Sequence, residues 1–159
     1  MAELRIRQAA RALVLDEEDR LLLVRFREGE RAVWLTTGGG LEEGESDEHA
    51  LRRELVEEAG LEEFDLGPLV WTRLVHAPLD GGRWDGQSER FYLVRVTAFD
   101  PAPRLSWEEL AEEGMTAVRW WTGEELETAT ARFAPRRLPI LLRELIRHGP
   151  PAEPVDVGL

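Results

Sequence analysis

Residues 38–61 read GGGLEEGESDEHALRRELVEEAGL, and this stretch predicts one short helix. Ser46 is a favourable N-cap, and the two acidic residues after it would lie in the first turn, where the helix dipole stabilises negative charge. Gly60 stands where a glycine in the left-handed conformation commonly ends a helix. We therefore expect a helix over residues 47–59.

Three glutamates would share one side of this helix. At about 100° per residue, Glu57 and Glu58 fall roughly 60° and 40° to either side of Glu54. An apolar stripe borders them at intervals of four residues: Leu51, Leu55 and Ala59. Like charges at this spacing destabilise a helix by about 0.2–0.5 kcal/mol per pair, so a cation should offset them. Hard oxygen ligands suit Mg²⁺ or Mn²⁺, and Mg²⁺ commonly binds substrate phosphates as well.

A solvated acidic helix face, with an ion pair between Arg53 and Glu57, is the alternative interpretation. The spacing of the flanking residues decides between the two. Gly39 is followed by five residues and Glu45, then by seven residues and Arg53-Glu54-Leu55, one residue, Glu57-Glu58, one residue and Gly60-Leu61. This pattern matches every defined position of the Nudix box. The chain therefore resembles a Nudix hydrolase over residues 39–61.

The resemblance implies an α/β protein with the Nudix fold, an α/β/α sandwich around a mixed β-sheet. Apolar runs that favour strands occupy residues 4–15, 21–26, 32–36, 66–75, 89–99 and 118–121. The first two of these runs should form a hairpin. Ser106 and Thr122 are expected N-caps, and a last helix is expected over about 136–148, before Gly149.

Length and composition favour one domain. The 159 residues can bury a single core, which we place at residues 1–149, followed by a Pro-rich tail at 150–159 that should be disordered or loosely docked. The lack of cysteine excludes disulfides, thiolate metal sites and a cysteine nucleophile. No apolar run in the sequence reaches the length of a membrane span, so we expect a cytoplasmic protein with no membrane partner.

The net charge of −12 has the wrong sign for a protein that grips long nucleic acid through its phosphates. A small phosphorylated ligand can still bind where metal ions and a few arginines reverse the sign locally. We therefore expect a small nucleotide substrate and no long nucleic acid. The sequence shows no distinctive interface, so a homodimer is left open.

The resemblance also implies roles for the residues of the box. Glu57 and Glu58 would ligate Mg²⁺ or Mn²⁺, and Glu54 would be either a third ligand or the base that activates water. The backbone carbonyl of Gly39, or that of its neighbour Gly38, would add a ligand.

Other box residues would support this centre. Arg53 is grouped with the catalytic residues and would pair with Glu45, which fixes the loop to the helix. Gly39, Glu45 and Gly60 are expected to be structural. A further acid from outside the box is expected among three glutamates, Glu109, Glu112 and Glu113.

The reaction that the resemblance implies is hydrolysis of a nucleoside diphosphate linked to another moiety. Nucleotide sugars, ADP-ribose-like compounds and (deoxy)nucleoside triphosphates all remain open as substrates. Arg25 and Arg27 are candidates for binding phosphate, with ordinary surface charge as the alternative. Trp34, Trp84 and Tyr92 are candidates for stacking on a base, with core packing as the alternative.

Two other functions fit a related fold. A non-catalytic nucleotide-sensing module usually lacks box glutamates, whereas this chain keeps Glu54, Glu57 and Glu58. Isopentenyl diphosphate isomerisation needs a catalytic cysteine, which the sequence lacks. We therefore expect a hydrolase, with the sensing module as the alternative.

Overall fold

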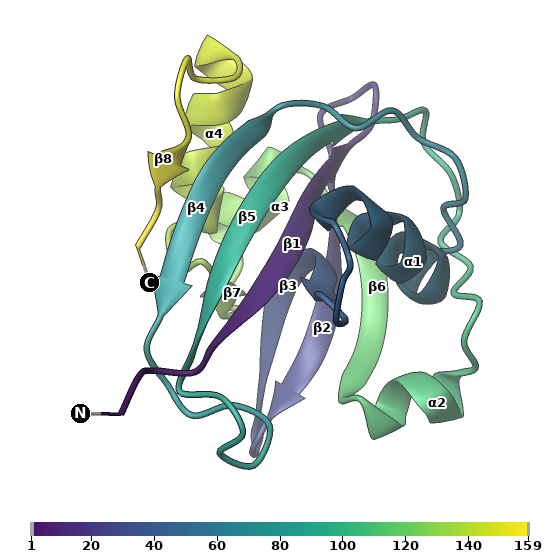
Figure 1. Ribbon diagram of the computed structural model, residues 1–159. Coiled ribbons are helices and arrows are strands. Elements are labelled where there is room, and N and C mark those ends of the chain that lie inside the picture. The colour runs from purple at the N-terminus through teal and green to yellow at the C-terminus, as the bar shows by residue number, and fades with distance from the viewer. Residues whose placement is uncertain (1, 159) are drawn as a thin grey trace.

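A mixed β-sheet forms the centre of the molecule, and helices lie on both of its faces (Figure 1). The computed structural model describes residues 2–158. Its elements, in chain order, are β1 (Ile6–Leu15), β2 (Leu21–Glu28), β3 (Arg31–Gly40), α1 (Asp47–Ala59), β4 (Leu69–Val75), β5 (Gly86–Arg95), α2 (Trp107–Glu112), β6 (Met115–Trp121), α3 (Gly123–Thr128), β7 (Phe133–Ala134), α4 (Leu138–His148) and β8 (Val155–Asp156). The expected α/β/α sandwich is confirmed.

Strand β1 occupies the centre of the sheet. The strand order is β6-β2-β3-β1-β5-β4-β8, with β7 paired to β3, and β1 runs parallel to β5 along its whole length. The expected hairpin of β1 and β2 is wrong, because these strands pair only at Leu15 and Leu21. The buried carboxylate of Asp16 accepts the backbone N–H groups of Glu18 and Arg20, which turns the chain tightly. Strand β2 then diverges from β1 and pairs with β3 and β6.

Helix α1 begins and ends where the sequence predicts. The Ser46 hydroxyl accepts the backbone N–H of His49 at 3.1 Å. At the other end Gly60 has φ +72° and donates its N–H to the carbonyls of Leu55 and Val56. Both helix ends are therefore satisfied within the box itself.

The ends of the other helices are also specified by nearby residues. Ser106 and Thr122 each form a capping box, with Glu109 and Glu125 respectively. Helix α4 carries Pro139 in its first turn, where a missing N–H costs nothing, and is followed by Gly149. Within residues 2–158 no helix combines the length and the apolarity needed to cross a membrane.

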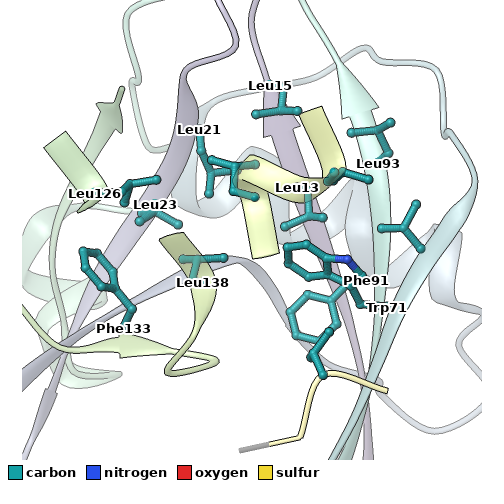
Figure 2. Close-up of a cluster of buried hydrophobic side chains, with 14 of the residues drawn as sticks. Leu13, Leu15, Leu21, Leu23, Trp71, Phe91, Leu93, Leu126, Phe133 and Leu138 are labelled. Carbon is teal, nitrogen blue, oxygen red and sulfur yellow. The ribbon is translucent and has the colours of Figure 1, made fainter. Parts of the chain in front are cut away.

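Two apolar layers hold the helices to the sheet. On one face, alternate residues of β1 and β2 pack against α1: Ala12, Val14 and Leu22 with Leu51 and Leu55. On the other face, the intervening residues Leu13, Leu15, Leu21 and Leu23 meet Leu126 of α3 and Leu138 of α4 (Figure 2). Because successive strand residues point to opposite faces, the same strands supply both layers. Each buried leucine stabilises the fold by about 1.5–3 kcal/mol.

The C-terminal tail is docked on the sheet, which differs from the expected disorder and agrees with the alternative of a docked segment. Val155–Asp156 forms β8, which pairs in parallel with the edge strand β4 at Trp71 and Thr72. Val157 donates its backbone N–H to the Thr72 carbonyl at 2.9 Å and is buried in the α4-side layer. One apolar side chain and an unpaired sheet edge therefore dock this Pro-rich segment, although its composition alone favours a loop.

We predict that Gly60→Ala will cost substantially more stability than Gly44→Ala. Both glycines have a positive φ, +72° and +79°, so both variants carry the strain of a left-handed alanine, about 1–2 kcal/mol. A Cβ at Gly60 would also overlap the carbonyl oxygen of Ala102, whereas a Cβ at Gly44 would meet nothing within 4 Å. Urea unfolding of both variants measures the difference. Equal losses would show that Ala102 moves aside freely.

Candidate active site

The N-terminus of α1 is fixed to the sheet by an ion pair. Arg90 of β5 donates two hydrogen bonds to Asp47, each of 2.6 Å, and the hydroxyl of Tyr92 donates a third at 2.5 Å. The Arg90 guanidinium is the largest cause that holds the pKa of Asp47 below its usual value. The pair sets where α1 starts on the sheet, and with it the position of the glutamates two and three turns later.

Arg53, in the middle of α1, ties the preceding loop to the helix. Its Nε and Nη2 donate to Glu45 at 2.9 and 2.8 Å, and Nη2 also reaches the carbonyl of Gly40 at 3.2 Å. The structure thus contains the pair that the sequence led us to expect. The Arg53 guanidinium lowers the pKa of Glu45 to about 2.

The three glutamates of α1 lie beside residues 38–40 of β3, which are all glycine and which we call the glycine segment. Glu58 is only 3% exposed and accepts the backbone N–H of Gly38 at 2.8 Å. Glu54 accepts a hydrogen bond from Arg53 Nη1 at 2.9 Å and lies so close to Gly39 that a Cβ there would come within 2.7 Å of its carboxylate. Glu57 is more open and lies 3.9 Å from Arg53.

Burial and the charge of Glu54 disfavour the charged forms of Glu57 and Glu58. Burial, followed by the charge of Glu54, raises the pKa of Glu58 well above its usual value, and the N–H of Gly38 offsets only part of the effect. Burial also raises the pKa of Glu57, with the charge of Glu54 as the second cause. A cation between these side chains would relieve both penalties.

Comparisons with known proteins agree with this geometry. A family model described as the NUDIX domain matches residues 5–143. The chain belongs to the Nudix family. It is 36% identical over 120 residues to the RNA pyrophosphohydrolase of Saccharophagus degradans, and the match covers 69% of each chain.

The chain is also similar to a plant protein and to a bacterial crystal structure. Nudix hydrolase 25 of Arabidopsis thaliana is 33% identical over 94 residues, which cover 52% of this chain and about half, 53%, of that relative. A crystal structure of a NUDIX hydrolase from Nitrosomonas europaea aligns with a TM-score of 0.71 at 15% identity, covering 99% of this chain and 82% of that one. The second similarity shows a shared fold.

The donor set of the Nudix helix suits a divalent cation. Its three carboxylates offer only hard oxygen atoms, and among residues 2–158 no basic side chain comes within 4 Å of the buried Glu58. With the side chains in their present positions, no three acidic or histidine side chains in this part of the chain converge as a metal site. Arg53 holds Glu54, and the N–H of Gly38 holds Glu58, so a cation would compete with these partners.

Three acids outside the Nudix box are candidates for a further ligand, and one of them, Glu113, interacts electrostatically with the box glutamates. Burial and the charge of Glu54 raise the pKa of Glu113, which follows α2. Its own charge contributes to the raised pKa values of Glu57 and Glu58. Glu109 is used instead in the capping box of α2. Glu113 is therefore the candidate that the structure favours.

The structure groups some of the predicted substrate-binding residues. Arg25 of β2 pairs directly with Trp34 of β3, so the two side chains share a sheet face, and Arg27 lies on that face two residues further along. Both arginines are exposed, and Trp34 contacts Trp121 edge-on with ring centroids 5.1 Å apart. This is the face opposite α1, and these three residues form a cationic and aromatic strip, which we call the arginine strip.

Two other predicted substrate-binding residues lie apart from the arginine strip. Tyr92 packs in the layer beneath α1, and its hydroxyl is used by Asp47. Trp84 lies in the loop between β4 and β5, with the Arg83 guanidinium 5.5 Å above its ring. The contacts of Tyr92 favour the core-packing alternative.

The hollows of the surface give no further guide to the substrate. One of about 480 Å³ lies beside Phe64 and Phe99, and one of about 330 Å³ lies between α3 and α4, near Leu142. Neither is lined by a box glutamate or by the arginine strip.

Two groups of polar side chains on the sheet were not predicted from the sequence. Arg90 and Asp47 anchor α1, while Arg11, Glu89 and Arg73 form a cluster on the opposite sheet face. A usable signal existed for Glu89, since it precedes the inward-facing Phe91 and Leu93 by two and four residues. A charged residue at a core-facing position of a strand requires a buried partner.

We predict that Glu45→Gln will reduce the acid sensitivity of the fold. Because the folded pKa of Glu45 is about 2, below the usual 4.5, its contribution to stability is present above pH 4.5 and is lost as the pH falls toward 2. Thermal unfolding of wild type and variant between pH 6 and 3 measures this. Glu43→Gln, in the same loop and exposed, is the control for loss of one charge. Parallel pH profiles for wild type and Glu45→Gln would contradict the assignment.

Proposed function

We propose that the chain is a divalent-metal-dependent pyrophosphohydrolase that cleaves a nucleoside diphosphate linked to another moiety. The observation that carries the proposal is the buried carboxylate of Glu58, beside Glu54 and Glu57, with no basic partner within 4 Å among residues 2–158. Such a cluster costs stability unless a cation offsets it. Its position within a complete Nudix box supports hydrolysis over simple cation storage.

The residues that would hold the cation are Glu57 and Glu58, with Glu54 and the carbonyl of Gly39 as further ligands. Mg²⁺ or Mn²⁺, when bound, would neutralise the pyrophosphate oxygens and make a bound water more acidic. Carboxylate oxygens at a glycine-lined edge suit both ions.

The side chains of this chain would divide the remaining work. Glu54 is placed either to complete the ligand set or to take the proton of the attacking water, because it stands against Gly39 and outside the deeply buried position of Glu58. Arg53 holds Glu54 and Glu45 at once and so keeps loop and helix in register. Glu113 would add negative charge from the side of α2.

The substrate is expected to be a small nucleotide whose phosphates reach from the glycine segment toward the arginine strip. Arg25 and Arg27 would bind phosphate, and Trp34 offers part of a ring for stacking on a base. The similarity to an RNA pyrophosphohydrolase adds RNA to the candidates, alongside nucleotide sugars, ADP-ribose-like compounds and nucleoside triphosphates. The net charge of −12 favours a short ligand among them.

A panel assay tests the proposal. Phosphate, pyrophosphate or nucleotide release is measured from each substrate class, with Mg²⁺, with Mn²⁺ and with chelator. We expect turnover of one class that disappears with chelator and falls by about 100-fold or more in Glu57→Gln, because losing a ligand exceeds the 10–100-fold cost of losing a residue that only orients one. Glu48→Gln is the matched control, since Glu48 lies exposed on the same helix.

The same assay separates the hydrolase from a nucleotide sensor. Tight binding of one compound, measured by calorimetry, without turnover of any compound in the panel would contradict the hydrolase. Turnover that persists with chelator would contradict the role of the metal ion.

We predict that Arg25→Gln will raise KM with little change in kcat. An exposed guanidinium that contacts a phosphate away from the reacting bond binds ground state and transition state alike. Steady-state kinetics on the substrate that the panel identifies provides the measurement. Arg147→Gln, at the far end of α4, controls for the loss of one positive charge. An unchanged KM in Arg25→Gln would show that the arginine strip is ordinary surface.

A further inference from the structure

Three charged side chains lie on the sheet face opposite α1, in an otherwise apolar pattern. Arg11 shares the face of Leu13 in β1, Glu89 that of Phe91 in β5, and Arg73 is paired directly with Glu89 from β4. Glu89 accepts from Arg11 Nε at 2.8 Å and from Arg73 Nη1 at 2.5 Å. We call this set the Arg11 cluster.

The Arg11 cluster is buried and carries a net positive charge. The side chains of Glu89, Arg11 and Arg73 are 3%, 12% and 14% exposed. Although burial acts to raise it, the two guanidinium groups hold the pKa of Glu89 below its usual value, so the carboxylate is ionised. Replacing such a buried ionic group by apolar residues of similar volume is often neutral or stabilising, so stability alone explains the cluster poorly.

One member of the Arg11 cluster reaches the active site. Arg11 Nη1 donates to the carbonyl of Gly38 at 3.1 Å, and the N–H of Gly38 donates to Glu58 at 2.8 Å. The pairing of β2 with β3 ends at Leu23 and Thr36, so Gly38 lies beyond the part of β3 that β2 supports. Arg11 from one sheet face and Glu58 from the other therefore meet at the same residue.

Gly38 cannot be fixed by a side chain of its own. Its φ is +118°, and a Cβ there would overlap the carbonyl oxygen of Ala10. Arg73 shares the charge of Glu89 but makes no hydrogen bond to Gly38. Arg11 is therefore the member of the cluster that connects the buried ion pair with Glu89 to the glycine segment, through its hydrogen bond to Gly38.

We propose that Arg11, held in place by Glu89, is a positioning residue that fixes Gly38 and through it the carboxylate of Glu58 for binding the metal ion. The inference rests on the proposed function, because it takes Glu58 to be a metal ligand. It assigns a role in the active site to Arg11 of β1 and Glu89 of β5, both outside the Nudix box.

The test compares Arg11→Gln with Arg73→Gln in the substrate-free protein. Each variant removes one cation from Glu89, so both should lower the melting temperature. Binding of Mn²⁺ is then measured from the electron paramagnetic resonance signal of the free ion. We expect Arg11→Gln to weaken Mn²⁺ binding by about tenfold or more, as is usual for residues that orient a ligand, and Arg73→Gln to change it much less.

A second variant keeps the test decisive if Arg11→Gln folds poorly. Arg11→Lys preserves a charge beside Glu89, but an ammonium lacks the planar fork that reaches Glu89 and Gly38 together. We expect it to weaken Mn²⁺ binding with a smaller loss of melting temperature. Equal weakening in the Arg11 and Arg73 variants, or no weakening in either Arg11 variant, would overturn the proposal.

The failure of this inference can be told apart from the failure of the proposed function. If wild type binds Mn²⁺ and Glu58→Gln does not, while Arg11→Gln binds as wild type, only the positioning role falls. If wild type and Glu58→Gln bind Mn²⁺ equally weakly, the Nudix helix does not form the metal site. Both proposals are then contradicted.

Discussion

The rest of this structure depends on one constraint, the burial of the Glu58 carboxylate beside β3 with no basic side chain within 4 Å of it among residues 2–158. Glu58 is shielded from water and receives one backbone N–H, while the charge of Glu54 on the same helix face repels it. The fold must supply the free energy that keeps this arrangement in place. Two apolar layers do so, since apolar residues of β1 and β2 pack against the helices on both sheet faces.

Holding the carboxylates in the right place is a separate requirement from stabilising the fold, and polar contacts serve it. Asp47 fixes the start of α1 to β5, Arg53 fixes its middle to the box loop, and Gly38 fixes Glu58 to β3. Each contact joins segments far apart in sequence or crosses the box loop. The helix is thus located at three points along its length, and its glutamates have little freedom to spread under their mutual repulsion.

Local signals in the sequence were sufficient for the box and its helix. Ser46, the acidic first turn and Gly60 specify the boundaries of α1 through contacts within a few residues, and the resemblance to the Nudix box implied the ion pair of Arg53 with Glu45. The pairing of strands that are distant in sequence cannot be predicted from such local residues. The hairpin expected for β1 and β2 failed because a buried turn at Asp16 sends β2 toward β3, and the tail was docked by a single valine, Val157, at a sheet edge.

The pairing of β2 with β3 ends at Thr36, and this explains the position of the candidate active site. Beyond Thr36, strand β3 is paired with β1 but is no longer supported by β2, so the peptide groups of the glycine segment become available to side chains from both sheet faces. Glu58 reaches Gly38 from the side of α1, and Arg11 reaches it from the side of the arginine strip. The box glutamates and the arginine strip therefore belong to different elements, since the glutamates lie on α1, Arg25 lies on β2 and Trp34 lies on β3. Changes in the arginine strip can accordingly leave the contacts that hold the box glutamates intact.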